Sequence, residues 1–155
     1  MVQEQNDTIE MGGFGARFLT QAEGFSLVEH PIAPRTLAAP MHAHTHEDEY
    51  TYVLEGEVGI QIGDEVRYAG PGELIEKPRG IAHAFWNRTD EPARVLEVIA
   101  PGGFEQYFAE LVPLVTQCPP DLAGVGALAA RYGLEMDPES IGWLCEREGL
   151  RPPGA

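Results

Sequence analysis

The amino-acid sequence predicts an all-β fold, a sandwich or barrel of short strands, followed by a C-terminal α-helical extension. The chain of 155 residues contains 18 glycines and 13 prolines, which together indicate many turns. Between Phe14 and Ile99, short runs of β-forming residues alternate with turn signals. After Pro101 the apolar residues change to helical spacing.

Glycine or a polar turn bounds each strand of the predicted β body. The predicted strands are one that ends near Gln21 and those at residues 25–29, 50–54, 58–62 and 95–99. Because no helical pattern separates these strands, they predict a sandwich or barrel. The first twelve residues are polar, and we expect them to be loose.

Three helices are expected in the extension. They cover residues 104–116, residues 121–132 with Asp121 as N-cap and Gly133 as stop, and a third segment that starts at residues 137–139. A segment of this size is too small for an independent core, so we expect it to pack on the β body or on a partner subunit. We therefore divide the chain into a barrel domain of residues 1–103 and an extension of residues 104–155.

Charge and cysteine content exclude several classes of function. The chain has 10 basic and 25 acidic residues, a net charge of -15. Such a field repels phosphate backbones and anionic membranes, so we expect neither nucleic acid nor a membrane as partner. Cys118 and Cys145 lack the spacing of a disulfide framework or metal site, and residues 1–7 show no signal-peptide pattern. These features favour a cytoplasmic protein with reduced thiols.

Three histidines and one glutamate form a candidate metal-ligand set. His42 and His44 are two residues apart, so they point the same way if their segment is extended. A turn after His44 lets Glu49 rejoin the inner face, and a barrel brings His83 to the same point. Imidazole ligands suit zinc, iron, copper and nickel. Glu49 is also the candidate catalytic base, because a carboxylate near a metal can accept a proton.

Four further residues are candidates for a substrate pocket: Phe85, Thr51, Val53 and His46. Phe85 is the strongest of them because it shares strand parity with His83. For His46 three interpretations stay open: a solvated loop residue, a group behind the ligands, or an alternative ligand. We favour the first two, and we expect His30, beside a proline at a strand end, on the surface.

The two histidine segments resemble the two motifs of the cupin superfamily. The first motif is matched by His42, His44, Glu49 and Gly56, with Thr36 where the family usually has glycine. The second is matched by Gly72, Pro78, Gly80, His83 and Asn87. The motif segments cover residues 36–56 and 72–87. This resemblance implies a double-stranded β-helix, or jelly-roll, barrel that carries one divalent metal ion on the four ligands.

Residues 47–57 are most similar to the quercetin dioxygenase-like branch of that superfamily. Membership would imply an iron, nickel, manganese, cobalt or copper ion, dioxygen as co-substrate, a small aromatic or enolisable substrate, and a homodimer. In such a reaction Glu49 takes a proton from the substrate, and dioxygen attacks the resulting electron-rich carbon. Two alternatives stay open, since fold alone does not fix function. One is a non-redox isomerase, cyclase or decarboxylase, and the other is a non-catalytic binding or sensor module.

Overall fold

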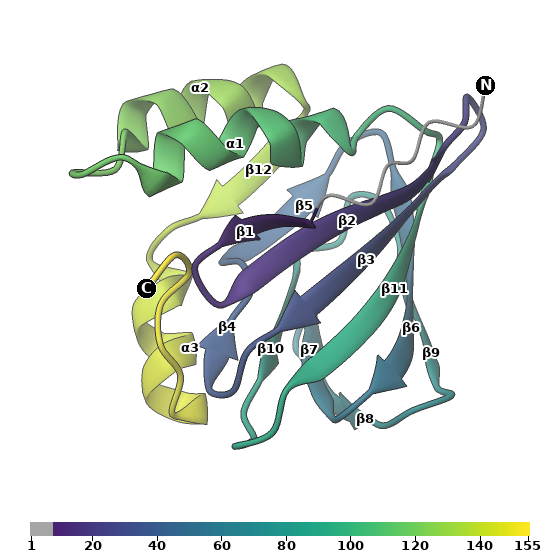
Figure 1. Ribbon diagram of the computed structural model, residues 1–155, viewed down its shortest axis with the longest axis vertical. Coiled ribbons are helices and arrows are strands. Elements are labelled where there is room, and N and C mark those ends of the chain that lie inside the picture. Colours follow the sequence, from purple (N-terminus) through teal and green to yellow (C-terminus); the bar gives the residue numbers. More distant parts are fainter. Residues whose placement is uncertain (1–7) are drawn as a thin grey trace.

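Two packed β-sheets form the body of the protein in the computed structural model, which describes residues 8–155 (Figure 1). The first sheet contains, in spatial order, β1 (Thr8–Met11), β2 (Phe14–Gln21), β3 (Ser26–Ile32), β11 (Ala93–Ala100), β6 (Asp48–Glu55) and β9 (Leu74–Lys77). The second contains β12 (Leu134–Asp137), β5 (Met41–His44), β10 (His83–Asn87), β7 (Val58–Ile62) and β8 (Glu65–Ala69), with β4 (Thr36–Leu37) paired to β10. The predicted all-β body is confirmed.

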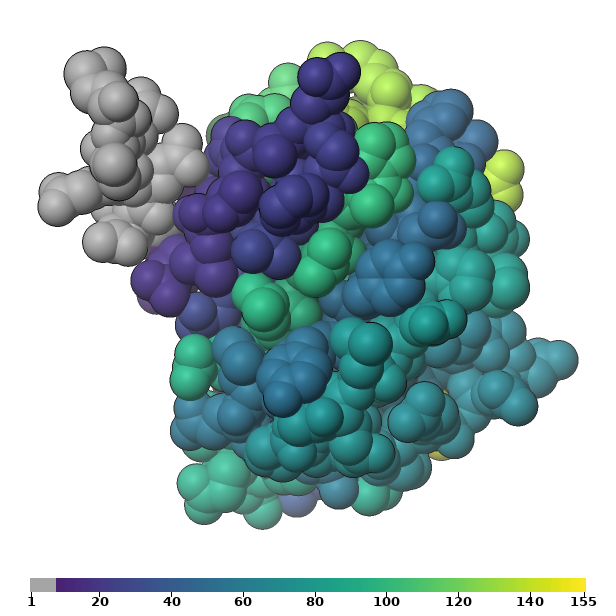
Figure 2. Space-filling model, turned by 90° about the vertical axis from the view of Figure 1, so that its right-hand side faces the viewer, coloured from purple at the N-terminus to yellow at the C-terminus, as the bar shows by residue number. Residues whose placement is uncertain are grey.

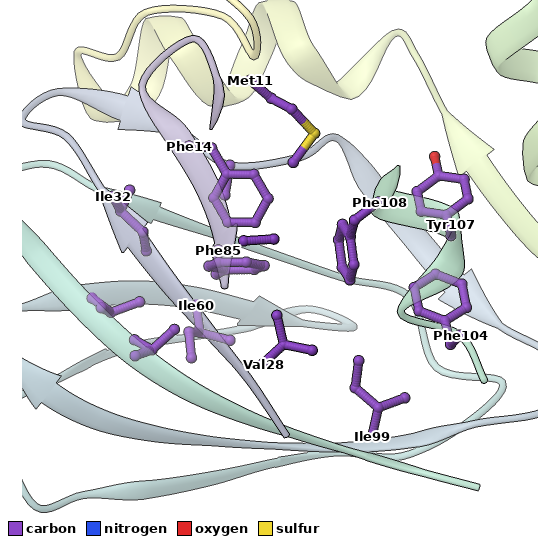
Figure 3. Close-up of a cluster of buried hydrophobic side chains, with 14 of the residues drawn as sticks. Met11, Phe14, Val28, Ile32, Ile60, Phe85, Ile99, Phe104, Tyr107 and Phe108 are labelled. Atoms are coloured by element: carbon purple, nitrogen blue, oxygen red, sulfur yellow. The ribbon is translucent and has the colours of Figure 1, made fainter. Parts of the chain in front are cut away.

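Alternation of side chains along the strands creates the core between the sheets. In β11 the buried residues are Ala93, Val95, Glu97 and Ile99, while the residues between them are only partly buried. The outward sides of β2, β3, β11 and β6 form one continuous face of the molecule, where the purple and dark-blue N-terminal strands lie beside green β11 (Figure 2). The inward sides enclose a cluster of aliphatic and aromatic residues (Figure 3).

Three helices follow the β body in the described part of the chain, which confirms the helical extension. They are α1 (Gln106–Thr116), α2 (Leu122–Arg131) and α3 (Ser140–Glu148). Asp121 caps α2 by accepting a hydrogen bond from the Gly124 backbone, and Gly133 follows its end with a φ of 67°. The helices α1 and α2 lie side by side over one end of the β body, and α3 lies beside β4 (Figure 1). Among the described residues, none of these helices is long and apolar enough to cross a membrane.

The structure corrects two local predictions. Residues 8–11 are not loose, because they form β1 and pair with β2; residues 1–7 lie outside the described part of the chain. The segment before α3 is not helical from residue 137, because residues 134–137 form strand β12 instead. That strand pairs with β5, so β5 has neighbours on both sides.

Candidate metal centre

The structure brings His42, His44, Glu49 and His83 together at one buried point between the sheets. Strand β5 carries the first two histidines, and its residue His42 lies opposite His83 of β10. Glu49 projects from β6 in the other sheet, where it lies opposite Ile99 of β11. One ligand atom from each of the four side chains lies within 4.8 Å of all the others.

Hydrogen bonds at the rear of two imidazoles orient their other ring nitrogens toward this point. His42 Nδ1 donates to the Pro40 carbonyl at 2.7 Å, and His83 Nδ1 donates to the Ile81 carbonyl at 3.3 Å. His44 Nδ1 lies 3.6 Å from Glu47 Oε2, and neither atom has a hydrogen-bond partner within the described residues. The two bonds to backbone carbonyls place a proton on Nδ1 of His42 and of His83, which leaves Nε2 of each free to bind a metal.

The donor atoms face one another as a metal site requires. Glu49 Oε1 lies 2.8 Å from His44 Nε2 and 3.1 Å from His83 Nε2. Lone pairs held this close repel one another unless a proton or a cation lies between them. Three imidazoles and one carboxylate are also a normal ligand set for a divalent transition ion, so the chemistry of the donors fits such an ion.

A buried ion pair lies behind Glu49. Lys77 Nζ is 2.8 Å from Glu97 Oε1 and 3.9 Å from Glu49 Oε1. Thr51 donates a hydrogen bond to Glu97 at 2.8 Å, and the Lys77 ammonium also lies 4.8 Å from the centre of the Phe85 ring. This network holds two carboxylates around one cation at the base of the candidate metal site.

The network separates the acidities of its two carboxyl groups. Burial opposes the charged form of Glu49, but the Lys77 ammonium and His44 outweigh it and hold the Glu49 pKa well below its usual range. Burial raises the pKa of Glu97 to about 7, with the Glu49 charge acting in the same direction and Lys77 against it. Glu49 is therefore the carboxylate that stays charged beside the histidines.

A cavity of about 560 Å³ opens from the cluster toward the helices. Its polar wall at the barrel end includes His42, His44 and Glu49. Most of the remaining wall is apolar: Met11, Phe14, Phe85, Phe104, Tyr107 and Phe108 from the barrel and α1, and Leu122, Val125 and Ala129 from α2. Figure 3 shows Phe14 close to Phe85, with Phe108 facing them from the side of α1. The cavity can hold a small aromatic molecule next to the ligand cluster.

The predicted pocket residues occupy different positions. Phe85 lines the cavity, whereas Thr51 and Val53 are fully buried and do not form its wall. His46 is exposed and lies near Gly133. His30 differs from its prediction: it is 2% exposed and lines the cavity, because its place in β3 turns it inward although a proline follows it.

Sequence comparison now identifies the family. A family model described as the cupin domain matches residues 29–99, and this segment contains all four clustered side chains. The fold agrees, since KdgF from Halomonas sp. superposes with a TM-score of 0.61 at 17% identity, over 68% of this chain and 94% of that one. Residues 29–99 therefore form a cupin domain. Thr36, where many cupins carry glycine, is 1% exposed in β4 and donates a hydrogen bond to the Pro34 carbonyl.

Two curated relatives of this chain carry names from different areas of chemistry. One is the probable oxidoreductase virH of Hypocrea virens, 31% identical over 87 residues, which are 54% of this chain and 40% of that protein. The other is the tetracenomycin polyketide synthase protein TcmJ of Streptomyces glaucescens, 33% identical over 88 residues, which are 54% of this chain and 58% of that protein. The matched segment thus spans about half the length of these relatives.

Proposed function

We propose that this cupin is a metal-dependent dioxygenase that acts on a small aromatic or enolisable substrate, similar to quercetinases. The observation that carries the proposal is the position of the ligand cluster at the end of a cavity with aromatic walls. A substrate ring fits against Phe14, Phe85 and Phe108, and one of its hydroxyl groups then faces the three histidines and Glu49.

Each buried residue near that hydroxyl has a role in this proposal. The three imidazoles would hold the ion, which when bound supplies positive charge that favours an anionic oxygen and, if it is redox-active, electron transfer to dioxygen. Glu49 is charged in the site and accepts the proton of the substrate hydroxyl. The apolar wall excludes water from the deprotonated substrate.

The names of the two curated relatives support different parts of this proposal. One of those proteins is described as an oxidoreductase and the other as part of polyketide synthesis. The second name also keeps a redox-neutral reaction, such as a cyclisation, as the alternative candidate.

Metal content is the first test. Purified, tag-free protein is analysed for bound elements, wild type beside His83→Ala and His46→Ala. We expect about one iron, nickel, manganese, cobalt or copper ion per chain, lost in His83→Ala and kept in His46→Ala, because His46 lies outside the cluster. No metal in the wild type, even after reconstitution, would contradict the proposal.

Oxygen consumption is the second test. The metal-loaded protein is offered quercetin and a panel of smaller enolisable phenols in an oxygen-electrode cell. We expect uptake of dioxygen in step with loss of substrate, and Glu49→Gln should abolish turnover while much of the metal stays bound. Substrate loss without oxygen uptake would favour a redox-neutral enzyme, and full metal occupancy with no turnover on any substrate would favour a binding or sensor module.

Assembly is a separate prediction. We expect a homodimer, and size-exclusion chromatography with light scattering measures it directly. A monomer at micromolar concentration would remove this part of the proposal and leave the metal site unaffected, because all four candidate ligands belong to one chain.

A further inference from the structure

His30 is a cavity histidine that the metal centre does not use. It projects from β3 into the same cavity as the ligand cluster and is 2% exposed. Its ring centre lies 4.7 Å from that of Phe14 and 5.1 Å from that of Phe108, with Phe85 at 6.3 Å. Three aromatic rings thus hold this imidazole in place.

A single hydrogen bond determines which ring nitrogen of His30 carries its proton. His30 Nδ1 lies 2.7 Å from the Gly15 carbonyl oxygen. A carbonyl oxygen only accepts, so Nδ1 is the donor. Burial lowers the pKa of His30 to about 4, with the Gly15 bond opposing and the Lys77 charge assisting, so the ring is neutral at pH 7. In a neutral imidazole with a proton on Nδ1, Nε2 is a hydrogen-bond acceptor.

The acceptor at Nε2 has no protein donor within the described residues. The only side-chain hydrogen bond of His30 among the described residues is the one at Nδ1, and the aromatic rings that contact it, those of Phe14, Phe85 and Phe108, carry no N–H or O–H group. An unpaired acceptor on the wall of an apolar cavity can accept a hydrogen bond from a ligand that carries an O–H or N–H group there. A ligand that fills the cavity without offering a donor leaves this nitrogen unpaired.

We propose that His30 Nε2 accepts a hydrogen bond from a second hydroxyl group of the aromatic substrate and so selects dihydroxylated over monohydroxylated rings. This inference rests on the proposed function for the first hydroxyl, which faces the ligand cluster. The two polar positions, one at the cluster and one at His30, lie on the wall of the same apolar cavity. A ring bound at both positions has its orientation fixed, which an apolar wall alone does not achieve.

The test is a binding comparison on zinc-loaded protein, which is redox-inert and does not consume the probes. Dissociation constants are measured by calorimetry for β-naphthol, for a set of dihydroxynaphthalene isomers, and for their monomethyl ethers. We expect at least one dihydroxy isomer to bind about three- to tenfold more tightly than β-naphthol, the increment of one net hydrogen bond. Methylation of the second hydroxyl should remove that increment.

Two variants test whether the tighter binding of the dihydroxy isomer depends on His30. In His30→Asn the amide nitrogen can keep the bond to Gly15, but no acceptor remains near the position of Nε2. In His30→Gln the longer side chain places an amide oxygen near that position. We expect the preference for the second hydroxyl to fall to about one- to twofold in His30→Asn and to recover partly in His30→Gln.

The outcomes separate this inference from the proposed function. An unchanged preference in folded His30→Asn, no preference in the wild type, or equal binding of the methyl ethers would each overturn the role of His30. The methyl-ether comparison needs only the wild type, so it decides the matter even if both variants fail to fold. A His30-dependent preference in a protein that consumes no dioxygen would leave this inference standing and remove the dioxygenase.

Discussion

Lys77 and Glu97 form an ion pair of 2.8 Å in the interior of the protein, where their side chains are each 1% exposed. A buried pair of this kind contributes little by itself, but loss of one partner leaves an unpaired charge in the core. In Lys77→Met, the carboxylates of Glu49 and Glu97 would face each other without a cation. We expect the variant to lose about 3–5 kcal/mol of unfolding free energy, measured by urea denaturation of the metal-free protein.

The double variant Lys77→Met/Glu97→Gln is the matched control for this prediction. It removes both charges and keeps a side chain of similar size that can accept from Thr51. It should be more stable than Lys77→Met alone, because the second change relieves the uncompensated carboxylate. Additive losses from the two changes would show that the two residues are not coupled.

The neutral state of His30 predicts how stability depends on pH. Burial lowers the pKa of His30 from 6.5 to about 4, so the unfolded chain binds a proton there before the folded one does. The unfolding free energy that depends on a neutral His30 is therefore fully present above pH 6.5. It is lost as the pH falls toward about 4, a decrease of about 3 kcal/mol. The unfolding free energy of wild type and His30→Asn, measured across this range, should converge at low pH. Parallel curves would contradict a neutral, buried His30.

Gly59 is expected to be a position where even a methyl group is not tolerated. It lies opposite Trp86 in the pairing of β7 and β10, and a Cβ at Gly59 would come within 2.2 Å of the Trp86 indole nitrogen. Trp86 is fully buried and cannot move aside, so Gly59→Ala should cost about 1–3 kcal/mol in thermal or chemical unfolding. Gly24→Ala is the control, because a Cβ there meets nothing within 4 Å. Equal stability of the two variants would refute the close approach.

Leu134 is expected to affect the metal site without touching it. It pairs with His44 across β12 and β5, and its side chain is buried in the core and lines the cavity. Leu134→Ala should lower stability by about 2–4 kcal/mol and speed the loss of metal to a competing chelator, since it loosens the neighbour of β5. Glu135→Ala, an exposed change in the same strand, should do neither. Unaltered metal retention in Leu134→Ala would mean that β5 is held without β12.

Spacing predicted the ligand cluster, because strand parity and two motifs determine which side chains face inward. The same parity could have found Glu97, since it shares the inward face with Val95 and Ile99 in a predicted strand. Lys77 shares the inward face of β9 with Ile75, so parity places it inside. It was harder to predict because a lysine is seldom expected in a core. His30 and β12 depend on long-range packing: β12 forms only because the tail returns to β5, and no local pattern in residues 134–137 indicates that pairing.

The cavity is built from two parts of the chain, the barrel and the C-terminal tail that returns to β5. The barrel strands carry the four clustered side chains, whereas residues of α1, α2 and β12 form much of the opposite wall of the cavity. Sequence change in α1 and α2, which do not pair with β5, can therefore alter which molecules fit inside while the four clustered side chains stay the same. For protein engineers, a library confined to α1 and α2 would vary the ligands that fit beside an unchanged candidate metal site, whereas a chain shortened to the barrel would lose both that wall and one of the two strands that pair with β5.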